Sequence, residues 1–238
     1  MVKKWMYRFF VVAFVLSLAT LSQGGMRAPV RAQALSLITY FPLMHKAEPT
    51  RLDDFEDEDP PWQYTWTEVK DGLFFHRDGR YAARIEDNSA VGVAWPGWRP
   101  LADFELEADA RFATQEWGNG LGIVFGGNDT WTEYYAFMLV FNFKQHFWSF
   151  ARVEPTDDFN RLSWGGAPNF VRPYKNWNHL KVVRIGSSIR VYCNGIQMPN
   201  GEYTDATYGA GRLVGVLATS YEGSTGEVEF DNFKLTPR

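Results

Sequence analysis

Short segments in which apolar and polar residues alternate, separated by turn signals, run through the chain from residue 52 onward. The clearest is 104–112, Phe-Glu-Leu-Glu-Ala-Asp-Ala-Arg-Phe, where every second residue is apolar. Successive side chains of a β-strand point to opposite faces, so this pattern predicts a strand with one face in a core. Asp78-Gly79 and Asn194-Gly195 are tight-turn pairs beside such segments. With no amphipathic helix pattern among them, they predict an all-β fold, a two-sheet antiparallel β-sandwich.

The segment 132–142 departs from this alternation because both of its faces are apolar. One face would carry Tyr135, Phe137, Leu139 and Phe141, and the other Tyr134, Ala136, Met138 and Val140. In a two-sheet sandwich only one face of a strand meets the core. The second face must therefore be covered by loops or line an apolar cleft, and the sequence leaves both alternatives open.

The first 34 residues have the three parts of a secretory signal peptide. Lys3, Lys4 and Arg8 form a basic start, residues 9–21 carry no charge, and Ala32-Gln33-Ala34 matches the small-residue pattern before a cleavage site. The uncharged run is shorter than the ~20 residues that a membrane-spanning helix needs. We expect cleavage after residue 34 and a secreted, extracellular protein. An uncleaved N-terminal anchor is the alternative.

Without residues 1–34 the chain becomes clearly acidic. That segment holds five of the 24 basic residues and none of the 28 acidic ones, so the remaining 204 residues have a net charge of −9. We divide them into an N-terminal segment or linker, 35–51, and one domain, 52–238. Nucleic-acid binding needs a basic footprint, so the charge excludes a nucleic-acid partner and disfavours a membrane surface for the mature form.

The single cysteine, Cys193, rules out an internal disulfide. It alternates with Val191 and Ile189 on a predicted strand, so we expect a buried, unreactive thiol.

The order of short motifs along residues 52–238 resembles the concanavalin A-like lectin/glucanase superfamily, which includes LamG-like domains. More narrowly, it resembles the jelly-roll domains of exo-inulinases and of proteins called 3-keto-disaccharide hydrolase-like. The motifs are Asp53-Asp54-Phe55 with Trp62, Asp78-Gly79-x-Tyr81, Asp103-Phe104-x-Leu106-x-Ala108, Gly120-x-Gly122-Ile123-Val124-Phe125, Asn178-x-Leu180-x-Val182, Val191-Tyr192-x-Asn194-Gly195 and Phe230-Asp231-Asn232-Phe233. The resemblance implies a two-sheet antiparallel jelly roll whose concave sheet often holds glycans. That fold also hosts hydrolases and structural domains, so it does not settle the function.

Catalysis of the laminarinase type is not supported. Those superfamily members carry Glu-x-Asp-x-x-Glu on one strand, and the nearest match here begins at Glu107 but has Phe112 in the sixth position. Glycoside hydrolysis usually needs two carboxylates, and the second is missing.

Three carboxylates, Glu105, Glu107 and Asp109, nevertheless share one face of the 104–112 strand. They would form the acid/base set if the protein is an enzyme. The alternative is a solvated strand face whose charges pair with basic residues of a neighbouring strand, for which the candidates are Lys181, Arg184 and Arg190.

Aromatic side chains are numerous, with 10 Trp, 11 Tyr and 19 Phe. Flat rings stack on the apolar faces of sugars, while nearby polar groups bind the hydroxyls. The ligand-binding candidates are Trp117, Trp131, Tyr134, Trp148 and Trp164 for stacking, with Arg152 for hydrogen bonds. The alternative is that these rings fill the core or cover its rim.

The resemblance also implies a structural calcium ion, since superfamily members often join their first and last strands through one. Asp54 and Asp231 match that arrangement loosely, whereas the acidic run 53–59 is otherwise a solvated loop. No other cofactor is expected.

Three functions follow from these observations. The first is a secreted, non-catalytic carbohydrate-binding domain that stacks glycans on aromatic rings of the concave sheet. The second is a glycoside-cleaving enzyme of the 3-keto-disaccharide hydrolase type. The third is a structural or adhesive cell-surface domain without a small ligand. The partner expected under the first is a polysaccharide or glycan.

Overall fold

The computed structural model describes residues 49–57, 59–67, 72–85, 91–100, 103–114, 118–141, 146–156, 159–220 and 225–238. The predicted signal peptide, most of the 35–51 segment and Trp117 lie outside these residues. Residues His45–Arg238 form one compact unit, and the description below concerns this unit alone.

The described residues form strands and no helix, as the alternating pattern predicted. In chain order the strands are β1 (Arg51–Asp53), β2 (Gln63–Thr67), β3 (Gly72–His76), β4 (Tyr81–Ile85), β5 (Val91–Trp95), β6 (Phe104–Phe112), β7 (Asn119–Gly127), β8 (Tyr134–Phe141), β9 (His146–Val153), β10 (Phe159–Gly166), β11 (Asn178–Ile185), β12 (Ser188–Cys193), β13 (Ile196–Thr204), β14 (Leu213–Ser220) and β15 (Gly226–Pro237). Among the described residues there is no helix with the length and apolar character that spanning a membrane requires.

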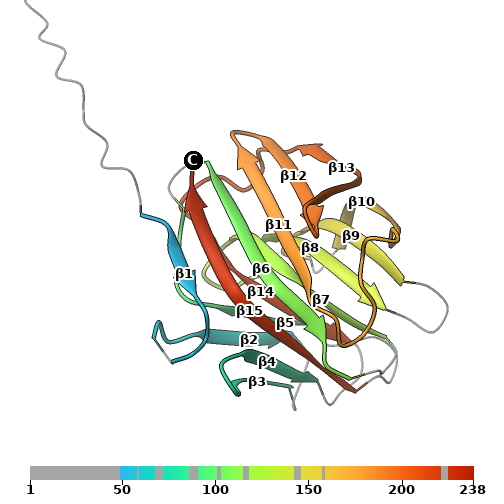
Figure 1. The fold of residues 1–238 in the computed structure, drawn as a ribbon. Helices are drawn as coiled ribbons and strands as arrows, with labels where there is room; N and C mark the ends of the chain where they lie inside the picture. Colours follow the sequence, from blue (N-terminus) through green and yellow to red (C-terminus); the bar gives the residue numbers. More distant parts are fainter. Residues whose placement is uncertain are drawn as a thin grey trace, which may run out of the picture. The chain divides into compact units, whose positions relative to one another are not determined.

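The strands form two antiparallel sheets (Figure 1). The eight-stranded sheet has the order β13-β12-β11-β6-β15-β4-β3, with β1 paired to β15, and the seven-stranded sheet has the order β10-β9-β8-β7-β14-β5-β2. The first and last strands are therefore neighbours, as β1 residues 51–53 pair with β15 residues 233–235. The predicted all-β, two-sheet sandwich is confirmed.

The predicted tight turns are confirmed by backbone angles. Asp78 and Gly79 have φ values of 51° and 66°, and Asn194 and Gly195 have 52° and 80°. Two consecutive positive φ values match the right-handed twist of the flanking strands, and this is the reason that Asn-Gly and Asp-Gly pairs are favoured at such turns. These turns join β3 to β4 and β12 to β13.

The core lies between the two sheets and is lined by alternate residues of each strand. On β6 the apolar set from Phe104 to Phe112 faces this core, while Glu105, Glu107 and Asp109 face outward. On β7, Gly122 allows close approach of β8, because a Cβ at that position would stand 2.2 Å from the carbonyl oxygen of Phe137. A larger residue would force the two strands apart.

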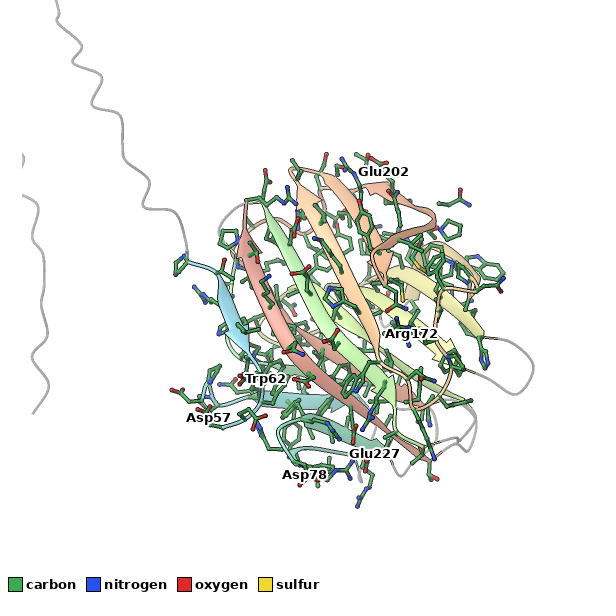
Figure 2. The ribbon with its side chains drawn as sticks, in the orientation of Figure 1. Asp57, Trp62, Asp78, Arg172, Glu202 and Glu227 are labelled. Atoms are coloured by element: carbon green, nitrogen blue, oxygen red, sulfur yellow. The ribbon has the colours of Figure 1, made fainter. Side chains whose placement is uncertain are left out.

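The opening motif has a structural role that joins β1 to the core. Asp53 is buried and accepts two hydrogen bonds, from the backbone N–H of Phe55 at 2.9 Å and from the indole N–H of Trp62 at 2.7 Å. The Phe55 ring stacks on Tyr81 with 5.4 Å between centroids. Figure 2 shows Trp62 close to β1 and β15. Asp53, Phe55 and Trp62 therefore stabilise the sandwich.

Candidate ligand-binding sites

The outer face of the seven-stranded sheet is apolar and largely covered. The second face of β8 contributes Ala136, which is 0% exposed, and Met138, which is 3% exposed. Aromatic side chains pack over this face as a second cluster, in which Trp131 lies 5.2 Å from Trp95 and 5.8 Å from Tyr134, measured between ring centroids. Most of this face is therefore covered, which was the first of the two alternatives that the sequence left open. The cover consists of side chains from the sheet and its turns.

Part of that face stays open as a hollow of about 160 Å³, which we name the apolar hollow. Its lining residues come from β5, β8, β9, β10 and β14 and are Val91, Met138, Phe147, Ser149, Phe159, Arg161, Thr219 and Ser220. Arg161 is exposed and makes no ion pair with any residue in the described ranges. The apolar cleft that the sequence left open is thus present, but small.

Two hydroxyls at this hollow lack a hydrogen-bond partner in the described part of the protein. The Ser149 and Thr219 side chains are each 1% exposed, and neither Ser149 Oγ nor Thr219 Oγ1 has a partner there. Such buried polar groups are uncommon, and each costs about 1–3 kcal/mol when it stays unpaired. They are therefore groups that a bound polar molecule would satisfy.

Trp164 stands beside the apolar hollow. It pairs with Ser149 across the β9–β10 ladder, so the two side chains share the outer face. Trp164 is 65% exposed. Gly166, two residues on, pairs with Phe147 and has no atom within 4 Å of a Cβ built there. The space above Phe147 and next to the Trp164 ring is therefore open.

The other predicted aromatic candidates lie elsewhere. Trp131 and Tyr134 are both 3% exposed and form part of the cover described above. Trp148 is 1% exposed and faces the core between the sheets, because it pairs with Leu139, an inner residue of β8. Tyr134 and Trp148 thus lie on opposite faces of one sheet, and no face of the Trp148 ring is open to a ligand.

Arg152 is held by acidic partners. Its guanidinium donates to Glu154 at 2.7 Å and to Asp205 at 2.5 Å, and Tyr135 Oη also donates to Asp205, at 2.6 Å. The pKa of Asp205 falls to about 2, because hydrogen bonds from Thr207, Tyr135 and Arg152 outweigh the effect of burial. Arg152 therefore stabilises the β13–β14 connection. It pairs with Tyr135 in the β8–β9 ladder, so it lies on the sheet face opposite the Trp164 ring and the apolar hollow.

The outer face of the eight-stranded sheet is charged instead of apolar. Glu105 pairs with Lys181 and Arg238, and Glu107 pairs with Lys181 at 3.4 Å and Lys234 at 3.4 Å. Of the basic partners that the sequence suggested, Lys181 is confirmed. Arg190 pairs with Glu202 of β13 instead.

The third suggested partner, Arg184, does not pair with these carboxylates. It lies opposite Phe104 in the β11–β6 ladder, which places it on the inner side of the sheet. It is buried there, and desolvation lowers its pKa.

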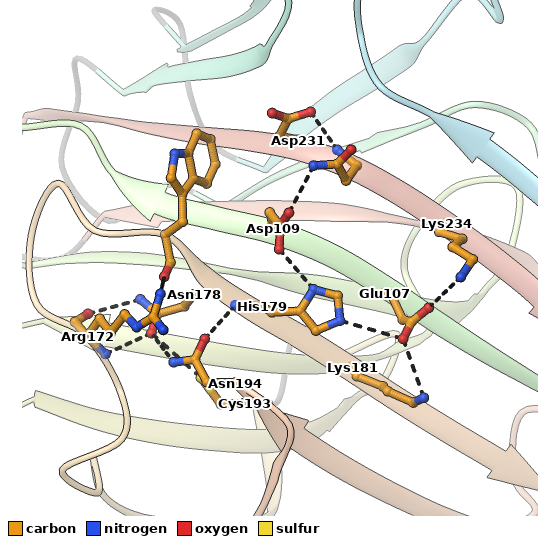
Figure 3. A network of polar contacts seen from close by, with 12 residues as sticks. Glu107, Asp109, Arg172, Asn178, His179, Lys181, Cys193, Asn194, Asp231 and Lys234 are labelled. Carbon is orange, nitrogen blue, oxygen red and sulfur yellow. Dashed lines mark hydrogen bonds and ion pairs between the residues drawn. The ribbon is translucent and has the colours of Figure 1, made fainter.

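His179 links two of the carboxylates (Figure 3). Its Nδ1 lies 2.8 Å from Asp109 Oδ1, and its Nε2 lies 3.5 Å from Glu107 Oε1. Hydrogen bonds to Asp109 and Glu107 raise the pKa of His179 to about 9, and the bond from His179 is the main reason that the pKa of Glu107 falls to about 2. Burial raises the pKa of Asp109, but bonds from His179 and Asn232 outweigh it and the pKa is lowered. Glu107 and Asp109 are thus carboxylates at neutral pH, and neither can act as a general acid.

A second hollow, of about 500 Å³, opens on this face next to Asp109, and we name it the polar hollow. Its lining residues are Asp109, Arg172, Trp177, His179, Asn194, Asp231 and Asn232. Only Asp109 and Asp231 belonged to the sets that the sequence suggested. Arg172, Trp177 and Asn194 come from the loop before β11 and the turn after β12, and no local pattern marks them as neighbours.

Asp231 and Asp54 are the two carboxylates predicted to hold calcium. Burial raises the pKa of Asp231, and the charges of Asp109 and Asp54 raise it further. Within the residues that the structure describes, no group of three or more His, Cys, Asp or Glu could hold a metal ion. The side chains present therefore do not by themselves form the oxygen-rich shell that calcium requires, and the calcium site stays a prediction.

Cys193 is buried and burial raises its pKa to about 12, so the predicted unreactive thiol is confirmed. Its Sγ lies 3.7 Å from Asn178 Oδ1.

Two stacked antiparallel sheets with paired first and last strands define a jelly roll of the concanavalin A-like lectin/glucanase class. The chain belongs to the family of 3-keto-alpha-glucoside-1,2-lyase-like domains, whose model matches residues 49–236. The resemblance drawn from the order of motifs is therefore confirmed. No curated protein sequence matches the chain.

Solved structures share the fold at low sequence identity. The carbohydrate-binding module CBM66 from Bacillus subtilis is 15% identical with a TM-score of 0.53, over 71% of this chain and 94% of the module. The exoplasmic/lumenal domain of VIP36 in its Ca2+/Man3GlcNAc-bound form is 14% identical with a TM-score of 0.58, over 79% and 88% of the two chains. The carbohydrate recognition domain of Emp46p in a potassium-bound form is 10% identical with a TM-score of 0.57, over 77% and 94%.

Proposed function

We propose that this domain binds carbohydrate at the apolar hollow, with Trp164 as the stacking ring, and does not cleave it. The observation that carries the proposal is the pairing of an open indole with two buried, unpartnered hydroxyls on the same sheet face. A sugar presents the complementary set, an apolar C–H face for the ring and hydroxyls for Ser149 and Thr219. Arg161 adds a free cationic donor at the rim.

The apolar hollow has room for one sugar unit of a longer chain. Its volume of about 160 Å³ lies below the usual range for a pocket that encloses a whole ligand. The open space at Gly166 continues the groove past the Trp164 ring. We therefore propose that a polysaccharide lies across the β9–β10 edge and inserts one unit beside Ser149. Carbohydrate as the class of ligand is supported by the VIP36 domain in its Man3GlcNAc-bound form and by the carbohydrate-binding module, which share this fold.

The absence of cleavage is the second part of the proposal. The carboxylate row of β6 has Glu105 and Glu107 in ion pairs, with the pKa of Glu107 at about 2. Glu107 is therefore ionised at neutral pH and cannot be the protonated carboxylic acid that glycoside hydrolysis usually uses. The family name makes a 3-keto-α-glucoside the substrate to try. Release of a sugar product from it by the purified domain would contradict this part and leave the binding part to be judged by the titrations below.

Binding can be tested by affinity electrophoresis of the mature domain through gels that contain α-glucan, β-glucan, mannan or fructan. We expect retardation by at least one polysaccharide and a Kd in the micromolar range for its oligosaccharide by calorimetry. A folded domain that no polysaccharide retards would overturn the proposal in favour of a structural or adhesive domain.

The location can be tested with a variant that fills the groove. In Gly166→Leu the new side chain enters open space, so folding should persist while the Kd rises at least tenfold. Gly209→Leu is the matched control, because its Cβ also meets nothing within 4 Å and it lies in the loop before β14, beyond the far end of that strand from Thr219. Trp164→Ala should weaken binding by a similar factor. The control for lost apolar surface is Leu73→Ala, an exposed residue of the other sheet. Equal loss in Gly209→Leu would contradict the assigned location.

A further inference from the structure

We infer that the polar hollow on the eight-stranded sheet is a second carbohydrate site, which takes a single neutral sugar unit, so that the domain binds saccharides on both outer faces. This inference rests on the proposed function, since it gives the same class of ligand to a second surface.

The charges that line the polar hollow balance. Asp109 and Asp231 are acidic, and Arg172 and His179 are basic. His179 stays protonated at neutral pH because its pKa is about 9. A site with no net charge favours neither an anionic nor a cationic ligand by long-range attraction, whereas it offers both acceptors and donors to a neutral molecule rich in hydroxyls.

Two of these groups have hydrogen-bonding capacity left over. The carboxylate of Asp231 accepts one bond, from the backbone N–H of the adjacent Asn232 at 2.7 Å. The guanidinium of Arg172 donates one bond, to the backbone carbonyl of Trp177 at 3.3 Å, and forms no ion pair with a described residue. By contrast, Glu107 contacts three cationic side chains. The unused donors and acceptors on this face therefore gather around the polar hollow.

The indole of Trp177 gives this hollow an apolar wall. It is half-buried, and the guanidinium of Arg111 lies 4.6 Å from its ring centroid. This cation–π contact holds the ring in place. A held ring beside unpaired polar groups is the combination that binds a sugar face and its hydroxyls, because little conformational entropy is lost on binding.

The walls are fixed by two amide side chains, one buried and one half-buried. Asn178 is fully buried, accepts from Arg172 N at 2.8 Å and donates to the Arg172 carbonyl at 2.9 Å. Asn194 accepts from the backbone N–H of His179 at 2.9 Å and donates to the Phe170 carbonyl at 2.7 Å. The loop that carries Arg172 and Trp177 is thereby fastened to β11 and to the β12–β13 turn (Figure 3). The geometry exists before a ligand arrives, which lowers the cost of binding.

The size fits a small ligand. A hollow of about 500 Å³ falls within the range of small-molecule sites. The apolar hollow is about 160 Å³ and continuous with an open groove, so the two hollows would bind saccharides in different ways. The apolar hollow would bind along a chain, whereas the polar hollow is open to solvent and would hold a single sugar unit. A domain with both would join two saccharide chains, and linked sites raise the apparent affinity for a surface that presents many copies.

The experiment uses saturation-transfer NMR and calorimetry on the mature domain with glucose, mannose, fructose and trehalose as probes. In the Gly166→Leu background, which blocks the groove at the apolar hollow, we expect binding of at least one probe to remain. Adding Asp231→Asn or Arg172→Gln should weaken that remaining binding at least tenfold. Each change removes one charge; Asp231→Asn also keeps the side-chain size, whereas Arg172→Gln shortens the side chain. The matched control is Glu202→Gln, which removes an exposed charge from the same sheet outside the hollow and should change the Kd less than twofold.

The outcomes separate the two proposals. If Gly166→Leu abolishes every signal and Asp231→Asn has no effect in the wild-type background, the second site is overturned and the proposed function stands. If Asp231→Asn and Arg172→Gln abolish binding while Gly166→Leu and Trp164→Ala do not, the second site stands and the apolar hollow fails. Near-ultraviolet circular dichroism of each variant checks that the fold persists, and Arg172→Lys, which keeps the charge but not the planar donor group, should recover part of the affinity.

Discussion

The two outer faces of the sandwich come from the same type of strand and differ in what covers them. The eight-stranded sheet meets solvent with a row of carboxylates and bases that neutralise one another, of which Glu107 with its three partners is the centre. The seven-stranded sheet covers most of its outer face with its own aromatic rings, and the buried hydroxyls of Ser149 and Thr219 line the hollow that this cover leaves. A charged face can stay in contact with solvent and tolerates substitution of its residues. An apolar face must be covered by other side chains or by a ligand.

A charge on the covered face should have the largest effect. Ala136→Asp would put a carboxylate at a position with 0% exposure, within a cluster of buried apolar residues. We therefore expect a loss of at least about 4 kcal/mol in the free energy of unfolding, or no folded protein. Urea unfolding measures it. The control is Asn160→Asp on β10, an exposed residue of the same sheet, which should change stability by less than about 0.5 kcal/mol. A stable Ala136→Asp protein would show that this face is open in solution.

On the charged face the buried carboxylate should matter most. Glu229 of β15 is 3% exposed in its side chain and contacts Arg77 at 2.6 Å and Arg111 at 2.5 Å. Glu229→Ala removes a buried carboxylate partner from Arg111 and from Arg77, of which Arg77 keeps its pair with Glu227. Because both guanidiniums are partly exposed, we expect a loss of about 2–3 kcal/mol. Glu202→Ala, which breaks the exposed pair with Arg190, should cost less than about 1 kcal/mol. Equal losses, compared by urea midpoints, would contradict the role of burial.

The His179 cluster should make stability fall at alkaline pH. Its pKa is raised from 6.5 to about 9 in the folded protein, so its contribution is complete below about pH 6.5 and disappears as the pH rises through about 9. The side chain is 42% exposed, and solvent screening reduces the effect to about 1 kcal/mol or less. Urea midpoints of wild type and His179→Gln should differ at pH 6 and converge near pH 10. A difference between the two urea midpoints that grows with pH would contradict the contacts of protonated His179 with Asp109 and Glu107.

Glu107 in the same cluster should respond at the acid end. Its pKa is lowered from 4.5 to about 2, so its contribution is present above about pH 4.5 and is lost as the pH falls through about 2. Together the two residues place the intact cluster between about pH 4.5 and 6.5. The same pair of urea titrations, run on Glu107→Gln, would show the variant and wild type converging below pH 3. A constant difference down to pH 2 would argue against the ion pair.

The smallest change in stability should follow removal of an unpaired hydroxyl on the covered face. Ser149→Ala removes no hydrogen bond to a residue that the structure describes, so we expect unchanged stability or a gain of up to about 1 kcal/mol, together with a Kd for oligosaccharide raised about three- to tenfold. Ser163→Ala is the matched control, because Ser163 Oγ donates to the Asn200 carbonyl at 2.9 Å and its loss should cost about 0.5–1.5 kcal/mol. A destabilised Ser149→Ala with unchanged binding would mean that the hydroxyl is structural.

The sequence predicted the charged outer face more completely than the apolar one. Strict alternation along 104–112 gave the strand, its buried side and its outward carboxylates, and Lys181 was correctly expected opposite them. The doubly apolar 132–142 segment was recognised as unusual, but its cover was not, since Trp131 folds back over the sheet from a turn and rests against Gly127. Among the ring candidates, local context could not separate exposed Trp164 from core Trp148, because the face that a side chain takes depends on the register between β9 and its neighbours.

By itself, the sequence determined the all-β class, the antiparallel hairpins at Asp78-Gly79 and Asn194-Gly195, the buried thiol and the family. These depend on period-two patterning, on the φ angles that short turns demand and on motif order, all of which are local. Only the tertiary structure decided which aromatic ring is open, which hydroxyls are buried without a partner, and that Arg172, Trp177, His179 and Asp231 meet at one hollow. Those facts depend on strand register and on contacts between residues far apart in the chain, which no short segment encodes.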